Sequence, residues 1–152
     1  GPKSFADHAD ISVVEARSQL DLLHREFPKL ESFKERLRKS AKTRGWVSTG
    51  FGRRVAVVRD RTYTRAPAAY GQGTARDVFL EGVLNLPEEV LEMVRIFVHD
   101  EIVLSVPRER AEEIKQCVLE AFESVQLPAA DGMSIPVLAD AAGPGENWSE
   151  CK

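Results

Sequence analysis

The sequence predicts an α+β fold in which several helices surround one β-hairpin. Apolar residues recur at helical spacing in segments 12–45 and 108–125, whereas segments 93–98 and 102–106 are apolar on both faces and rich in β-branched residues. The other β-prone runs are short. A length of 152 residues, with 43% hydrophobic and 30% charged side chains, is sufficient for one soluble globular domain or a large piece of one.

Two helices are predicted before residue 45. Ser12 and Glu15 form a capping-box pattern that starts the first helix, and Pro28 separates it from the second, which stops at Gly45. We expect a helical hairpin with a basic outer side. The apolar positions are Val13, Ala16, Leu20, Leu23 and Phe27 in the first helix and Leu30, Phe33, Leu37 and Ala41 in the second, and the basic side chains are Lys34, Arg36, Arg38, Lys39, Lys42 and Arg44.

A short β-turn-β segment and a third helix are predicted next. Strands are expected at 46–49 and 54–58, with Arg53 and Arg54 at the exit of a glycine-containing turn. The third helix is expected to begin near residues 72–74 and to end before Pro87. Gln72 and Arg76 are four residues apart and share a face, close to a helix N-terminus that favours phosphate. The alternative, that Gln72 is only a capping or loop residue, is favoured without further context.

The segment "IFVHDEIVLSVP" predicts a hairpin with an unusual turn. Strands at 93–98 and 102–106 leave His99, Asp100 and Glu101 as the tight connection, and both strands are expected in a covered sheet. Asp-Glu suits a two-residue turn poorly, and adjacent carboxylates repel each other unless a cation such as Mg²⁺ relieves them. An exposed acidic turn is the alternative. A helix at 108–124, a loop at 128–134 and a strand near 135–139 are expected to follow.

The charges are strongly segregated along the chain. Residues 29–76 contain thirteen basic and three acidic side chains, whereas residues 77–152 contain five basic and sixteen acidic ones. This distribution favours a polyanion-binding surface in the first segment, although a solvated basic helix explains it equally well. The two cysteines and three histidines show no metal-ligand spacing, which argues against structural zinc. No membrane span or secretory signal is evident, so we expect a cytoplasmic protein.

Several of these segments resemble one family in the correct order. "VHDEIVLSVP" is similar to motif C of the family A DNA polymerases, of the bacterial DNA polymerase I type; "QGTARD" resembles the start of the preceding helix, "GWVSTGFGRR" the segment before it, and "GENWSECK" the usual ending. The resemblance covers residues 11–152. It implies that the chain forms part of a polymerase palm with a motif C β-hairpin and flanking helices.

The resemblance also implies roles for individual residues in motif C. Asp100 is expected to be a ligand of the catalytic Mg²⁺ ions. Glu101 would be a supporting acidic residue or an occasional ligand. His99 matches a residue beside the primer terminus, so these three are the candidate catalytic residues. In the complete enzyme the substrates would be primer-template DNA and a deoxynucleoside triphosphate (dNTP).

A second group of residues is expected to contact DNA. Gln72 matches a glutamine that touches the minor-groove side of the terminal base pair, where acceptors are similarly placed on every pair. Arg53, Arg54 and Arg76 lie in the basic segment that would face duplex phosphates.

The sequence departs from the family pattern in three respects. Motifs A and B, which supply the second aspartate and the nucleotide-binding helix, do not occur in it, so the chain is expected to be a C-terminal piece that needs an N-terminal portion in cis or in trans and lacks activity alone. The 54–72 segment is shorter than in cellular enzymes. Thr64 and Ala68 occupy positions where those enzymes often carry Arg and Asn, and a compact, phage-encoded version would explain both differences.

Three segments and one alternative function complete the predictions. Residues 1–3 are interpreted as a cleavage-site remnant, residues 4–61 as the fingers/palm junction, and residues 62–152 as the palm portion with motif C. The alternative is a stand-alone binding module that engages DNA or a replication protein without catalysis. The retained Asp100, Glu101 and Gln72 favour the polymerase, whereas the missing motifs favour the module.

Overall fold

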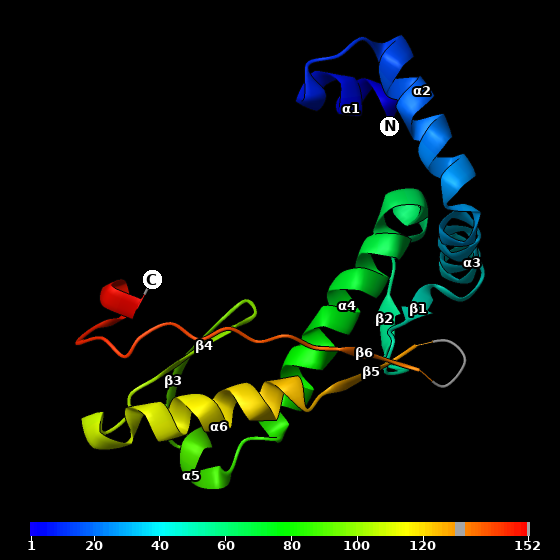
Figure 1. Cartoon of the computed structure of the whole chain (residues 1–152). Helices are drawn as coiled ribbons and strands as arrows, with labels where there is room; N and C mark the ends of the chain where they lie inside the picture. The colour runs from blue at the N-terminus through cyan, green and yellow to red at the C-terminus, as the bar shows by residue number, and fades with distance from the viewer. Residues whose placement is uncertain (130–132, 152) are drawn as a thin grey trace. The chain divides into compact units, whose positions relative to one another are not determined.

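The computed structural model describes residues 1–129 and 133–151 (Figure 1). The chain divides into two compact units: Gly1–Val47 with Ala56–Pro67, and Ser48–Val55 with Ala68–Lys152. Mixed helices and small antiparallel hairpins confirm the predicted α+β class. No helix in the described part of the chain is both long and apolar enough to cross a membrane.

The first unit is built from helices whose ends follow local sequence signals. The Ser12 Oγ accepts a hydrogen bond from the Glu15 N–H at 3.1 Å, which caps the second helix. Gly45 has a φ of 81°, the left-handed conformation that ends the third helix. Both predicted helices are therefore confirmed, and a further one precedes them. The helices are α1 (Pro2–Ala9), α2 (Val13–Glu26) and α3 (Pro28–Arg44).

The long helix α4 (Thr62–Leu84) begins ten residues earlier than predicted. The prediction was wrong because Pro67 lies inside the helix, where a proline removes one backbone N–H. The carbonyl left without that partner is the one four residues earlier, on Tyr63, and the Arg38 Nε donates to it at 3.1 Å. Gln72 is consequently a mid-helix residue, neither a cap nor a loop residue, and the expected phosphate-binding helix N-terminus is not at this position.

Two short strands, β1 (Trp46–Ser48) and β2 (Arg54–Ala56), pair where strands were predicted, with slightly shorter bounds. In the turn between them, Thr49 N–H donates to the Arg53 carbonyl at 2.8 Å, and Gly52 has a φ of 85°. A 3₁₀ turn, η1 (Arg59–Arg61), then leads into α4.

The predicted hairpin is present as β3 (Val94–Val98) and β4 (Glu101–Leu104), paired antiparallel. One face of it packs on a core made by Leu86, which follows α4, and by α5 and α6; in Figure 1 α5 is green and α6 is yellow. Ile96 and Phe97 are 43% and 58% exposed, so the expectation of a covered sheet is wrong for the described residues. Buried core residues are Leu86, Val90, Ile114 and Ala121, with Met93, Ile102, Leu104, Val118 and Phe122 packed against them.

The remaining elements follow the predicted order. The helix expected at 108–124 is present as a 3₁₀ turn followed by an α-helix, and the strand expected near 135–139 is present but starts one residue earlier and ends three residues earlier. Residues 130–132 of the predicted loop lie outside the described residues. The elements are α5 (Glu88–Leu91), η2 (Arg108–Arg110), α6 (Ala111–Glu123), β5 (Gln126–Pro128), β6 (Ser134–Pro136), paired with β5, and η4 (Trp148–Cys151).

Candidate functional site

The turn of the β3–β4 hairpin consists of His99 and Asp100. Val98 pairs with Glu101, so Glu101 is the first residue of β4. The prediction that Glu101 belongs to the turn is therefore wrong. His99 has a φ of 54°, a conformation that costs a residue with a Cβ about 1–2 kcal/mol. Glycine is the usual solution to that requirement.

The carboxylates of Asp100 and Glu101 are exposed. Neither makes a hydrogen bond or an ion pair with any residue in the described ranges, so both retain their oxygen atoms for an external ligand. Within those ranges, no group of three or more His, Cys, Asp and Glu side chains surrounds a common point. A protein usually contributes one or two carboxylates to a Mg²⁺ site, and water and substrate phosphates supply the other oxygen ligands. Asp100 and Glu101 fit that number.

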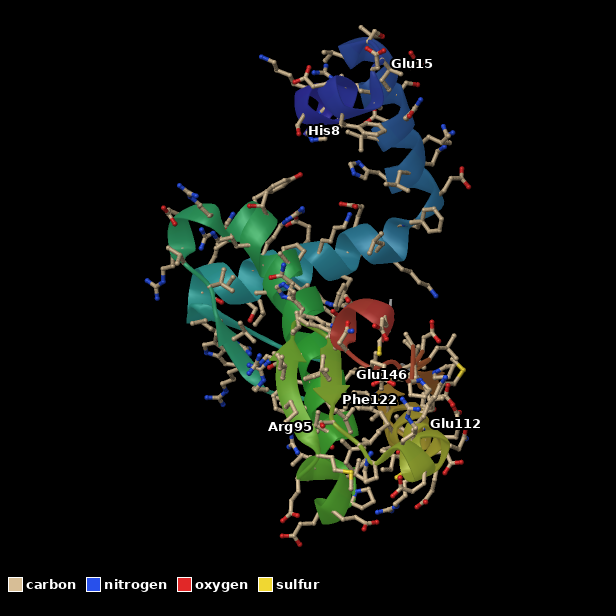
Figure 2. All side chains as sticks on the ribbon, turned by 90° about the vertical axis from the view of Figure 1, so that its left-hand side faces the viewer. His8, Glu15, Arg95, Glu112, Phe122 and Glu146 are labelled. Carbon is tan, nitrogen blue, oxygen red and sulfur yellow. The ribbon has the colours of Figure 1, made fainter. Side chains whose placement is uncertain are left out.

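Aromatic contacts hold the hairpin against α4. The rings of Phe97 in β3 and Phe79 in α4 meet edge-on, with centroids 6.2 Å apart, and Phe79 also meets Phe122 of α6 at 5.7 Å. Phe122, labelled in Figure 2, lies over Gly82, where a Cβ would come within 2.5 Å of its ring. The His99–Asp100 turn is thus carried by a strand that packs directly on the helix bearing Gln72 and Arg76.

Gln72 and Arg76 lie on the exposed face of α4, as predicted. The opposite face carries Gly73, Thr74 and Asp77, which are buried. The Thr74 Oγ1 accepts from the Gly50 N–H at 2.9 Å and donates to the Tyr70 carbonyl at 2.7 Å. This face therefore fixes the helix to the β1–β2 turn and leaves the other face open.

Arg53 takes part in the same attachment. Its Nε donates to the Asp77 Oδ1 at 2.5 Å and its Nη2 to the Gly73 carbonyl at 3.1 Å, while 45% of its side chain stays exposed. The side chain of Asp77 is only 8% exposed, and its second oxygen, Oδ2, is buried without a partner among the described residues. Arg54 lies at the start of β2 and is exposed.

Sequence reasoning missed Thr74 and Asp77. Both lie within the quoted "QGTARD" segment, at positions two and five after Gln72. The sequence signal for these residues was the helical spacing, because positions 73, 74 and 77 share one face of the helix and positions 72 and 76 share another. Only the contact with a turn 24 residues away shows that this face is buried.

The family model for DNA polymerase family A matches residues 1–150. The chain belongs to DNA polymerase family A. Residues 1–3, interpreted from the sequence as a cleavage remnant, lie within the match.

Curated family A relatives include the thermostable DNA polymerase I of Thermus filiformis, 32% identical over 93% of this chain and 18% of the relative. The DNA polymerase of Mycobacterium phage D29 is 32% identical over 73% of this chain and 18% of the relative. This chain therefore spans about a fifth of the length of these relatives. Among solved structures, the POL domain of Pol1 from M. smegmatis, in complex with DNA primer-template and dNTP, has the same fold, with a TM-score of 0.69 and 23% identity over 81% of this chain and 24% of that one.

Proposed function

We propose that this chain supplies the motif C part of a family A DNA polymerase active site. The single observation that supports it is the hairpin turn, in which a non-glycine residue with positive φ, His99, precedes two exposed carboxylates that have no partner in the described residues. A purely structural turn would replace His99 with glycine or asparagine and would have no use for adjacent negative charges.

Asp100 is the proposed Mg²⁺ ligand, and Glu101, one residue further along β4, is a supporting acidic group. When bound, the metal would lower the pKa of the primer 3′-hydroxyl and offset the negative charge of the triphosphate. His99 would sit beside the primer terminus and position it. Two-metal phosphoryl transfer needs further carboxylates, which motif A would provide, so we expect no primer extension by the chain alone.

The exposed face of α4 is the proposed contact with primer-template DNA. Gln72 would donate to minor-groove acceptors, which are similarly placed on every base pair, and Arg76 would contact a phosphate one helical turn further on. Arg54 would contact the backbone from the start of β2. Arg53 is attached to Asp77 and Gly73, and its exposed guanidinium edge is the part that remains for DNA.

A binding module without catalysis is the second candidate function. The observation in its favour is that no third acidic or histidine ligand joins Asp100 and Glu101 in the described part of the chain. In this case the exposed hairpin would contribute to binding DNA or a replication protein, and the carboxylates would have no catalytic role.

A complementation experiment tests the polymerase proposal. The chain is mixed with a polypeptide that carries motifs A and B, and primer extension with Mg²⁺ is measured for wild type, Asp100→Asn and the control Asp140→Asn, an exposed aspartate that is not part of the hairpin. We expect extension with wild type and Asp140→Asn, and a loss of about 10²–10³-fold or more with Asp100→Asn. Equal activity of both variants, or no extension in any mixture while the chain still binds DNA, would favour the module.

A further inference from the structure

One face of α3 carries a row of cationic side chains. The residues that line a shallow hollow there are Arg36, Lys39, Ser40, Thr43 and Arg44, and we call them the α3 row. They recur at intervals of three and four residues, so they follow one side of the helix. The side of α3 that carries Leu37 and Ala41 is buried. The α3 row is therefore a surface feature of the first unit.

The three cations of the α3 row have no carboxylate partner in the described residues. The two acidic residues of α3 are already paired with other basic side chains: Glu31 with Lys34, at 2.6 Å, and Glu35 with Arg38. From Arg36 to Arg44 no acidic residue occurs. Like charges at positions three apart, as at Arg36 and Lys39, destabilise a helix by about 0.2–0.5 kcal/mol per pair. An anion bound to the row would relieve this repulsion.

The contacts of the α3 row keep its charged groups directed outward. The Arg36 guanidinium lies 5.6 Å from the centroid of the Phe33 ring, and that of Arg44 lies 5.4 Å from the Trp46 ring, so both are positioned by cation–π contacts. Ser40 and Thr43 donate their hydroxyl protons to backbone carbonyls. The donors that remain for a ligand are consequently the cationic heads.

We propose that the α3 row binds the phosphate backbone of a nucleic acid strand, without reading its bases. From Arg36 to Arg44 the helix rises about 12 Å, a length of duplex axis along which one strand carries three or four phosphates. Ser40 and Thr43 donate their hydroxyl protons to backbone carbonyls, and the three cationic heads can each bind a phosphate oxygen, so we expect the contacts of the row to set the position of the strand. This inference rests on the proposed binding of primer-template DNA and adds a second contact surface, on a different unit from Gln72 and Arg76.

The salt dependence of DNA binding tests the proposal. Binding of the 152-residue chain to a 20-base-pair duplex and to a 20-nucleotide single strand is measured by fluorescence anisotropy between 50 and 300 mM salt. The triple variant R36Q/K39Q/R44Q is compared with K3Q/R17Q/R25Q, which removes the same charge from the same unit outside the α3 row. We expect the slope of log K against log salt to fall by about 2–3 in the first variant and by less than about 1 in the second.

A larger fall in slope for R36Q/K39Q/R44Q than for the control variant supports the proposal. Whether it occurs with the duplex, with the single strand or with both identifies the form of nucleic acid that the row binds. Equal slopes for the two triple variants, with the wild type binding, overturn it and leave the polymerase proposal intact, because that proposal depends on the Asp100→Asn result. The variant R36K/R44K keeps the charges and is a check on folding. It should retain the wild-type slope, and a fall as large as that of R36Q/K39Q/R44Q would also overturn the proposal.

Discussion

The Arg38 Nε donates a hydrogen bond of 3.1 Å to the Tyr63 carbonyl, and its guanidinium lies 3.8 Å from the centroid of the Tyr63 ring. Pro67 has no N–H to offer that carbonyl, so an arginine from α3 supplies the donor that α4 lacks. Arg38 is 9% exposed, and its Nη1 also pairs with Glu35. One buried arginine therefore allows α4 to continue through a proline.

We expect Arg38→Ala to lower the free energy of unfolding by about 2–3 kcal/mol, because it leaves the Tyr63 carbonyl without a donor and removes a buried side chain. Pro67→Ala restores the helical N–H, so Arg38→Ala should cost at least about 1 kcal/mol less in the Pro67→Ala background. Urea unfolding followed by circular dichroism measures both. The exposed Arg36→Ala is the control and should change the stability by less than about 0.5 kcal/mol; equal costs of Arg38→Ala in the two backgrounds would contradict the explanation.

Gly82 of α4 lies against the Phe122 ring of α6. A Cβ there would lie 2.5–2.8 Å from three atoms of the Phe122 ring. We expect Gly82→Ala to destabilise the chain by about 1–3 kcal/mol through overpacking, although alanine is the better helix former. Gly71, in the same helix, has open space around its Cβ position, and Gly71→Ala should stabilise by about 0.5–1 kcal/mol. Thermal unfolding of the two variants should thus shift in opposite directions.

The elements that could be predicted are those whose signals are local. Ser12 with Glu15, and Gly45, mark helix ends through contacts within four residues, and the structure confirms them. The start of α4 could not be predicted, because the donor that makes Pro67 tolerable comes from Arg38, 25 residues before Tyr63.

The same distinction applies to the candidate site. Gln72 and Arg76 share an exposed face because of helical spacing alone, and the hairpin follows from its apolar strands. The attachment of Arg53 to Asp77 depends on two segments meeting in space, and the positive φ of His99 depends on the strand register. Neither could be read from the amino-acid order.

Asp77 provides the buried end of the contact with Arg53. We expect Asp77→Asn to destabilise the chain by about 1–2 kcal/mol, less than for a fully buried pair because Arg53 is partly exposed. A double-mutant cycle with Arg53→Gln should give a coupling of about 1 kcal/mol. Asp60→Asn, an exposed aspartate in η1, is the control and should be neutral. Additive effects of the two substitutions would exclude a stabilising role for the pair.

The stability of α3 should depend on pH through Glu31. Its pKa lies below the ordinary value because Lys34 donates a hydrogen bond to the carboxylate, an effect that partial burial opposes and the charges of Lys34, His24 and Arg38 reinforce. Because the pKa of Glu31 is lower in the folded state, its carboxylate stabilises the folded state at pH values above its unfolded-state pKa of about 4.3. This stabilisation is lost as the pH falls through the lower, folded-state pKa. Glu31→Gln should therefore cost about 0.3–0.5 kcal/mol at neutral pH and nothing at about pH 2. An equal cost of Glu31→Gln at both pH values would contradict the contribution of the Lys34 contact.

His99 allows the strain of the hairpin turn to be separated from the role of its side chain. His99→Gly relieves the positive φ and should stabilise the chain by about 0.5–1 kcal/mol, whereas His99→Ala keeps the unfavourable conformation and should not. If the imidazole positions the primer terminus, both variants lower primer extension in the complementation experiment to a similar extent, despite their different stabilities. Full activity of the more stable His99→Gly would show instead that the histidine is dispensable and that only the shape of the turn matters for Asp100.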